Sequence, residues 1–285
     1  MKTTALTFAP TSDVTLRQCF AVGARSENTG IGIPLRIFFP LLSQPEYHVL
    51  AVPGLCYSEE LFYPWASALA AYGIETAVMA YDPMRSPKEK TLARCANDIA
   101  SAVAHLGHSP LVILAHSAPA LAIRLLTPEQ KGKHTWVIAL NPSLTQGFRM
   151  SRQVEWRLIR YMLRMKLGLP VEITRNHLVR FFLNDTPPET QANVLPLFRS
   201  DSGKLLNEIA ARKIRAGGKT RPDVIISAED DLINPTHAHE QMARIDGAVF
   251  IRVPGNHMSI CAPTASEIFM TVREDIMRLG KILRR

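Results

Sequence analysis

The chain has 285 residues, of which 47% are hydrophobic and 20% charged, and its formal net charge is +8. This size and composition suit one folded domain with an insertion, and they exclude a disordered or repetitive chain. No apolar stretch is long enough for a signal-peptide core or a membrane span, so we expect a cytoplasmic protein. The cysteines lack zinc-like spacing and are too few to cross-link the chain, so we expect reduced thiols at Cys19, Cys56, Cys95 and Cys261.

The first predicted elements are two strands, at residues 14–22 and 31–39, joined by a polar segment at 23–30. We expect them to form an antiparallel hairpin at the edge of a sheet. From residue 47 onward, strands alternate with helices, which predicts a parallel sheet covered on both faces. The predicted strands are 47–52, 75–80, 111–115, 136–140, 224–228 and 249–253, and the predicted helices are 59–72, 88–106, 121–126 and one beginning near Pro235.

Ser117 follows the apolar strand at 111–115 and precedes the helix-compatible stretch at 121–126. A strand, a sharp turn and a helix form the setting of a nucleophile elbow, in which a serine hydroxyl projects above a parallel sheet. A serine in this place is also a common helix N-cap. The position alone therefore leaves both interpretations open.

Asp231 and His257 follow the predicted strands at 224–228 and 249–253. Taken singly, Asp231 also fits a turn or a helix N-cap, and His257 fits an ordinary loop. Together with Ser117 they have complementary chemistry. A serine hydroxyl is a weak nucleophile until a neutral imidazole accepts its proton, and the imidazole needs a carboxylate to hold its tautomer. The order Ser, Asp, His, each just past a strand, favours a catalytic triad.

This arrangement resembles the α/β-hydrolase superfamily, from the strand before Pro53 to the helix after His257. The resemblance implies an α/β fold with a mostly parallel eight-stranded sheet flanked by helices. It also implies a helical cap inserted into the core, because the stretch after Asn141 lacks sheet-like alternation. We expect residues 1–142 and 222–285 to form the core and residues 143–221 to form the cap.

By the same resemblance, Ser117 is the nucleophile, His257 the base and Asp231 the acid. The family pattern of acid, any residue, branched apolar residue, any residue, proline fits Asp231 to Pro235, and Asp230 is one place out of register. Some relatives carry the acid after the strand that ends here at Asn141. An amide cannot serve as that acid, which favours Asp231.

Two departures from the family pattern occur near the expected oxyanion hole. The elbow has Ala115 and Pro119 where glycines are usual, and Pro119 biases Ala118 away from the αR region. Proline is nonetheless tolerated in the first turn of a helix. The usual His-Gly of the oxyanion loop is replaced by Pro53-Gly54. Because the hole uses main-chain donors, we expect the backbone N–H groups of Leu55 and Ala118 to serve, with Cys56 alongside.

The predicted cap has a distinctive charge. Residues 143–221 contain 15 Lys and Arg against 6 Asp and Glu, a net charge of +9, whereas the whole chain carries +8. One stretch within it predicts an amphipathic helix with an apolar face and a basic stripe. The apolar face is Val154, Leu158, Met162 and Met165, and the stripe is Arg157, Arg160 and Arg164.

Three interpretations of the stripe stay open. It is a solvated helix face, it recognises an anionic group of the substrate, or it attaches the protein to an anionic membrane surface through shallow insertion of Trp156, Ile159 and Leu163. Nucleic acid is disfavoured because no binding motif or stacking aromatics accompany the charge. His237-Ala238-His239 lacks a third ligand and is expected at the surface, so the sequence implies no metal and no cofactor.

The sequence therefore predicts a serine hydrolase that cleaves a carboxylic ester or thioester with a mainly apolar acyl group. Two alternatives remain. The same triad could transfer the acyl group to an acceptor other than water, or the chain could be a non-catalytic member that only binds a ligand.

Overall fold

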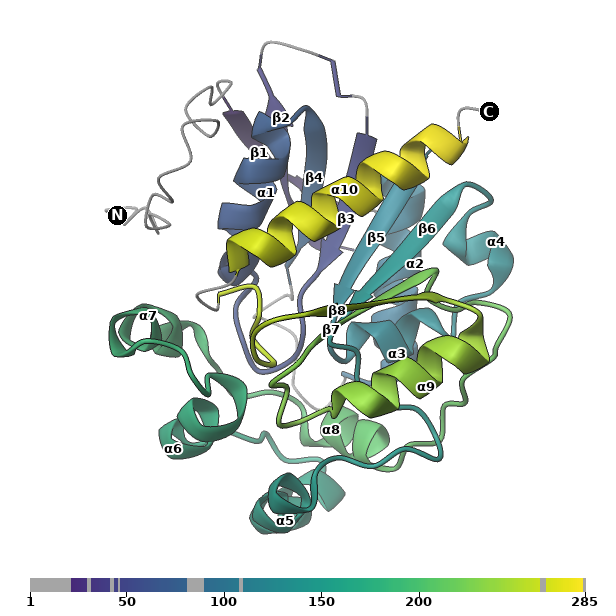
Figure 1. The fold of residues 1–285 in the computed structure, drawn as a ribbon. Helices are drawn as coiled ribbons and strands as arrows, with labels where there is room; N and C mark the ends of the chain where they lie inside the picture. The colour runs from purple at the N-terminus through teal and green to yellow at the C-terminus, as the bar shows by residue number, and fades with distance from the viewer. Residues whose placement is uncertain are drawn as a thin grey trace.

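The computed structural model describes residues 22–29, 32–41, 44–45, 47–80, 90–107, 110–261 and 265–283. Its centre is an eight-stranded sheet with the strand order β1-β2-β4-β3-β5-β6-β7-β8 (Figure 1). The strands are β1 (Val22–Asn28), β2 (Pro34–Pro40), β3 (Tyr47–Val52), β4 (Ile74–Met79), β5 (Leu111–His116), β6 (Thr135–Leu140), β7 (Val224–Ala228) and β8 (Val249–Val253).

The sheet is antiparallel at one edge and parallel elsewhere. β2 pairs antiparallel with β1 and β4, whereas every pairing from β4 through β8 is parallel. The predicted edge hairpin is present, but its first strand begins at Val22, and residues 14–21 lie outside the described part. Our assignment of residues 23–30 to a loop was wrong for 23–28. An edge strand is bonded along one side only and is exposed, so this polar sequence can form it.

Helices cover both faces of the sheet (Figure 1). Apolar side chains of α1 (Tyr63–Ala71) and α10 (Ala265–Leu283) pack in one cluster with one face of the strands. Those of α2 (Leu92–Leu106), α3 (Pro119–Ile123) and α9 (Thr236–Asp246) pack against the other face. Two short helices, η2 (Glu59–Phe62) and α4 (Pro128–Lys131), complete the layers. The predicted α/β fold is confirmed.

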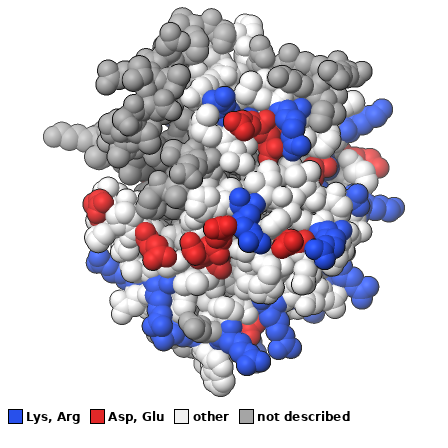
Figure 2. All heavy atoms as spheres, viewed as in Figure 1, with Lys and Arg blue, Asp and Glu red and all other residues white. Residues whose placement is uncertain are grey.

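The chain between β6 and β7 contains helices and no strand of the sheet (Figure 1). These helices lie at the end of the sheet where the parallel strands finish (Figure 1). Lys and Arg side chains gather on the molecular surface at the bottom of the view, near α5 (Figure 2). They are α5 (Arg152–Lys166), α6 (Arg175–His177), the π-helix η4 (Leu178–Phe182), α7 (Pro188–Val194), η5 (Leu195–Leu197) and α8 (Gly203–Ala210). We call residues 143–221 the inserted segment.

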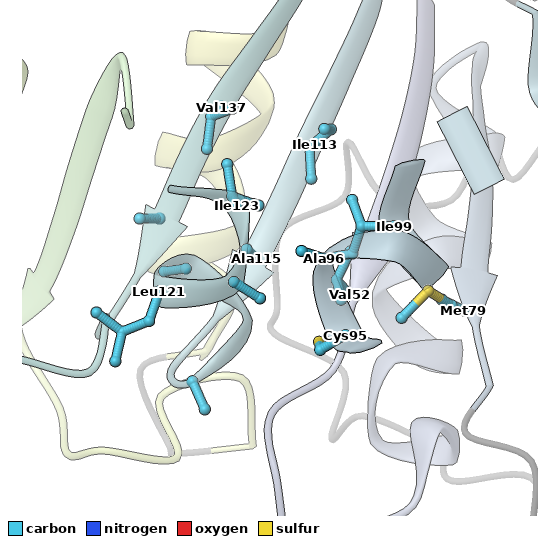
Figure 3. Packing of buried hydrophobic residues seen from close by; sticks show 14 of the residues in the cluster. Val52, Met79, Cys95, Ala96, Ile99, Ile113, Ala115, Leu121, Ile123 and Val137 are labelled. Carbon is cyan, nitrogen blue, oxygen red and sulfur yellow. The ribbon is translucent and has the colours of Figure 1, made fainter. Parts of the chain in front are cut away.

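The core fixes the ends of β3 and β5, where the candidate site begins. Figure 3 shows Ala96 and Ile99 of α2 packed over Val52 of β3, and Leu121 of α3 beside Ala115 of β5. All five side chains are at least 96% buried. Of the helices in the described part of the chain, none is long and apolar enough to span a bilayer.

Candidate active site

Ser117 occupies a sharp turn between β5 and α3. Its φ of +60° lies in the left-handed region, which costs a residue with a side chain about 1–2 kcal/mol. Backbone bonds to the neighbouring strand hold this conformation: Ser117 N–H donates to Leu140 O at 3.0 Å, and Ser117 O accepts from Ser143 N–H at 3.1 Å. A serine held in this way projects its hydroxyl away from the strand, as a nucleophile elbow requires.

Pro119 does not disrupt the elbow. It is the first residue of α3, where its missing N–H would have no intrahelical partner. Our expectation that Pro119 biases Ala118 away from the αR region does not hold, because Ala118 has φ −60° and ψ −38°. The buried contacts of α3 with the sheet outweigh the preference of a residue before proline for extended backbone.

The structure brings the three predicted triad residues together. His257 Nδ1 lies 2.8 Å from Asp231 Oδ2, and His257 Nε2 lies 3.2 Å from Ser117 Oγ. A carboxylate can only accept, so Nδ1 carries the proton and Nε2 is free to accept from the serine hydroxyl. This is the tautomer that base catalysis requires.

The register of the acid follows from its hydrogen bonds. Asp231 Oδ1 accepts the backbone N–H groups of Ile233 and Asn234, each at 2.9 Å, which leaves Oδ2 for His257. Asp231 is 4% exposed, whereas Asp230 is exposed to solvent. Burial alone would raise the pKa of Asp231, but the His257 imidazole and the Asn234 N–H outweigh it and hold this pKa below its ordinary value. The carboxylate therefore stays ionised.

The backbone of His257 is held from two strand ends. Its carbonyl oxygen accepts from Asn141 Nδ2 and from His116 Nε2, each at 2.9 Å. Asn141 also accepts from Ala228 N–H at 2.7 Å, so it connects the ends of β6 and β7 with the histidine loop. The sequence indicates only that Asn141 cannot act as the acid, and its bridging role is evident only from the structure.

A second buried chain of hydrogen bonds joins the histidine loop to the loop after β3. Because a carbonyl cannot donate, His116 Nε2 carries the proton, and His116 Nδ1 accepts from Tyr57 OH at 2.5 Å. Tyr57 OH in turn accepts from Gly54 N–H at 2.5 Å. Burial and then the neighbouring His257 lower the pKa of His116 to about 3, so this imidazole is neutral. A Cβ on Gly54 would lie 2.9 Å from Tyr57 OH, so only glycine fits.

The two predicted oxyanion donors have their backbone N–H groups available. Among the residues that the structure describes, neither the Leu55 nor the Ala118 N–H donates to a protein group. The N–H groups on either side of Leu55 are occupied, Gly54 by Tyr57 and Cys56 by Asp201 Oδ2 at 3.0 Å. The parallel pairing of β3 with β5 brings the loop after Val52 beside the elbow.

Cys56 has a strained backbone that the inserted segment holds. Its φ is +67°, its N–H is bonded to Asp201, and its carbonyl accepts from Arg199 N–H at 2.9 Å. Ser58 N–H continues the pairing by donating to Leu197 O at 2.8 Å. Cys56 is a free and buried cysteine, which agrees with the expectation of a reduced thiol at this position. Burial also raises the pKa of the Cys56 thiol.

The inserted segment also covers the base. The Phe182 ring packs edge-on against His257 with centroids 5.4 Å apart. A cavity of about 440 Å³ opens beside Cys56, with Leu178, Leu195 and Phe198 in its apolar wall and Arg175 and Arg199 at its polar side. A larger hollow of about 790 Å³ between α2 and α4 contains no triad residue. The cavity beside Cys56 has no triad residue in its lining either, but it adjoins the loop of the predicted oxyanion donor Leu55 through Cys56.

Two arginines of the predicted basic stripe lie on the surface. Arg157 and Arg164 are exposed, Arg157 lies 5.8 Å from the Phe181 ring centroid, and Arg164 Nε donates to Pro170 O at 2.8 Å. The Arg160 side chain lies outside the described part. No described contact joins Arg157 or Arg164 to the triad. The predicted apolar face was wrong at Met162, which is 43% exposed, because Tyr161 takes the inward position and is 6% exposed.

His239 corrects another expectation. We predicted a surface position for His237 and His239, but only His237 is exposed and His239 is fully buried. His239 Nε2 donates to Pro142 O and Nδ1 accepts from Ser227 OH, both at 2.7 Å. This role was not predictable from the sequence, because the helical period of α9 indicates which histidine faces the sheet only once the register of the helix is known.

Comparison with known proteins identifies the family. A model of the alpha/beta hydrolase family matches residues 49–263, a range that runs from within β3 to beyond the histidine loop. The chain belongs to the alpha/beta hydrolase family. The resemblance seen in the sequence is thus confirmed, and no curated protein sequence matches this chain significantly.

Several solved structures share the fold at low sequence identity. An esterase from Thermogutta terrifontis is 16% identical with a TM-score of 0.64, covering 90% of this chain and 99% of its own. A soluble variant of monoglyceride lipase from Saccharomyces cerevisiae, solved with a substrate analogue, is 16% identical with a TM-score of 0.66, covering 91% and 95%. A thioesterase domain from the curacin biosynthetic pathway is 12% identical with a TM-score of 0.60, covering 90% and 99%. At these identities the likeness concerns the fold.

Proposed function

We propose that this alpha/beta hydrolase is a serine hydrolase that cleaves a carboxylic ester or thioester with a mainly apolar acyl group. One observation carries the proposal. The chain Asp231–His257–Ser117 has hydrogen-bond spacing at both links, 2.8 and 3.2 Å, with the serine on a left-handed turn. Esterase, lipase and thioesterase structures with this fold are compatible with it.

In the proposed mechanism, His257 Nε2 takes the proton of Ser117 as Oγ attacks the acyl carbon. The ionised Asp231 stabilises the imidazolium that forms. The Leu55 and Ala118 N–H groups hold the oxyanion, and His257 then returns the proton to the leaving alcohol or thiol. Water activated by the same histidine attacks the acyl-enzyme, the bond to Ser117 Oγ breaks, and the carboxylic acid is released.

We propose that the inserted segment acts as a cap over this site. Phe182 contacts His257, and the pairing of residues 197–201 with the loop at 56–58 forms one wall of the cavity beside Cys56. Leu178, Leu195 and Phe198 supply an apolar part of the cavity lining, and Glu172, Arg175 and Arg199 supply a polar part. The apolar part supports an acyl chain as the occupant, since apolar side chains bind it by excluding water.

A panel of substrates tests the proposal. Graded p-nitrophenyl esters and acyl-CoAs separate esterase from thioesterase activity, and an added alcohol acceptor reveals acyl transfer. Replacing Ser117 with Ala removes the nucleophile, so we expect turnover to fall to the background rate while the melting temperature stays near that of the wild type. Binding of the panel compounds without turnover by the wild type would instead support the non-catalytic alternative.

A further inference from the structure

The two faces of α5 have opposite surroundings. On its inner face, Val154 is 3% exposed and packs with Phe181 and Ile233. At its start, the Ser151 hydroxyl donates to Leu232 O at 2.9 Å, next to the candidate acid. α5 is therefore fixed to the molecule through one face and one end, and its other face is free to make further contacts.

The outer face of α5 exposes a ridge of large apolar side chains. Trp156 is 74% exposed, Leu163 68%, Leu167 62% and Ile159 48%, and their spacing of three or four residues places them along one side of the helix. Together with Met162 they are five of the twelve exposed large apolar side chains in the described part of the chain. Such a concentration is typical of an interaction surface, whereas single exposed apolar residues are not.

Basic side chains flank this ridge. Four Lys and Arg of α5 are exposed, and its only acidic residue, Glu155, is paired with Arg212 at 2.8 Å. Figure 2 shows Lys and Arg around the end of the molecule where Figure 1 places α5. The exposed basic residues are Arg152, Arg157, Arg164 and Lys166. The partner surface must therefore combine negative charge with an apolar interior that accepts side chains.

We propose that the outer face of α5 docks on an anionic lipid bilayer and inserts Trp156 and Leu163 between the headgroups. An amphipathic helix lies in the bilayer interface when its apolar side is flanked by Lys and Arg, and tryptophan prefers that depth. A second copy of this chain would present the same positive charge and be repelled. A nucleic acid would satisfy the charge but leave the apolar ridge in water.

The docking surface also indicates a substrate class, and this part of the inference rests on the proposed function. Phe181 packs under α5, and its neighbour Phe182 contacts the imidazole of His257. A bilayer on the outer face of α5 thus lies against the segment that covers the candidate site. The substrate class that fits is an ester of a membrane lipid, because such a molecule is present at the surface on which α5 docks.

Vesicle binding by the full chain carrying Ser117→Ala tests the proposal without turnover. Vesicles of phosphatidylcholine with phosphatidylserine are compared with phosphatidylcholine alone by sedimentation and by tryptophan fluorescence. Of the three tryptophans, Trp156 is 74% exposed, Trp136 is partly buried and Trp65 is 2% exposed, so insertion of Trp156 should shift the emission to shorter wavelength. We expect binding to anionic vesicles that weakens as salt is raised, because exposed charges are screened.

Two variants separately remove the apolar side chains of the ridge and the basic side chains that flank it. Trp156→Ser with Leu163→Ser should abolish the fluorescence shift. Arg157→Gln, Arg164→Gln and Lys166→Gln together should weaken binding to anionic vesicles about a hundredfold, at roughly fivefold per basic residue. The matched control is Leu125→Ser with Ile245→Ser, which are 44% and 55% exposed and lie outside α5. The control should bind like the parent.

Equal affinity of the parent for anionic and neutral vesicles, or parent-like binding by both α5 variants, would overturn the proposal. Self-association that Trp156→Ser with Leu163→Ser abolishes, without vesicle binding, would also overturn it by assigning the ridge to a second copy. If the Ser117→Ala protein binds vesicles but the wild type hydrolyses no ester, the docking proposal is supported and only the proposed function is refuted.

Discussion

Asp231 uses its two carboxylate oxygens for different purposes. One accepts two backbone N–H groups and fixes the turn, and the other faces the imidazole of His257. Asp230 has an exposed side chain and no such contact, although the two acids are adjacent. The family pattern in the sequence indicates the same residue, but only the structure shows how the turn orients it.

Replacing Asp231 with Asn should lower turnover about ten-thousandfold, because an amide favours the wrong tautomer of His257. Asp230→Asn is the matched control and should change turnover by less than about tenfold, since the exposed carboxylate touches no reacting group. Initial rates on a short p-nitrophenyl ester measure both. A larger loss in Asp230→Asn would show that the acid is assigned one residue out of register.

The elements around the site are held together by buried polar side chains at strand ends. His116 ends β5, Asn141 follows β6, and both donate to the carbonyl of His257. Tyr57 extends this connection to Gly54, in the loop that carries the proposed oxyanion donor Leu55. We infer that Tyr57 is a positioning residue that keeps the oxyanion loop in register with the histidine loop.

Tyr57→Phe should lower kcat about tenfold or more and leave KM nearly unchanged, because one misplaced oxyanion donor costs turnover and not ground-state binding. The variant also leaves Gly54 N–H and His116 Nδ1 without a partner, which should destabilise the fold by about 1–3 kcal/mol. Tyr63→Phe removes the same atom from a partly exposed tyrosine and serves as the control. Equal kcat in the two variants would refute the positioning role.

At this scale the sequence predicted much of the architecture. The strands at 224–228 and 249–253 have the observed bounds, and Ser117, Asp231 and His257 lie together as the strand order requires. The buried hydrogen bonds that join the loops around the site were not predictable. They are made by Tyr57, Asn141 and His239, which contact segments distant from them in sequence. Met162 was misplaced because a helical period does not reveal which of two apolar faces is buried.

Within the part of the chain that the structure describes, two histidines, His116 and His239, are fully buried and neutral. Burial, in each case the main cause, lowers the pKa of His116 to about 3 and that of His239 to about 4, from an ordinary value of 6.5. Below about pH 6.5 the unfolded chain protonates both residues, whereas the folded protein does not. The unfolded state therefore binds more protons, and the free energy of unfolding falls as the pH drops from 6.5 towards 4.

Each histidine contributes a slope of up to about 1.4 kcal/mol per pH unit in this window. His239→Gln keeps a donor for Pro142 O and an acceptor for Ser227 OH but does not titrate. Urea unfolding between pH 7 and pH 5 should thus show a shallower loss of stability in the variant than in the wild type. Parallel curves would mean that His239 is not kept neutral by the fold.

The central claim, at the scale of the whole molecule, is that the fold activates one serine among all those of the chain. The most direct measurement is treatment of the native protein with a fluorophosphonate, followed by mass spectrometry of its peptides. We predict a single modified residue, Ser117, and no modification in Ser117→Ala or in the urea-unfolded wild type, since activation depends on His257 in the folded site. Modification at another serine, or none at Ser117 in the native protein, would contradict the account.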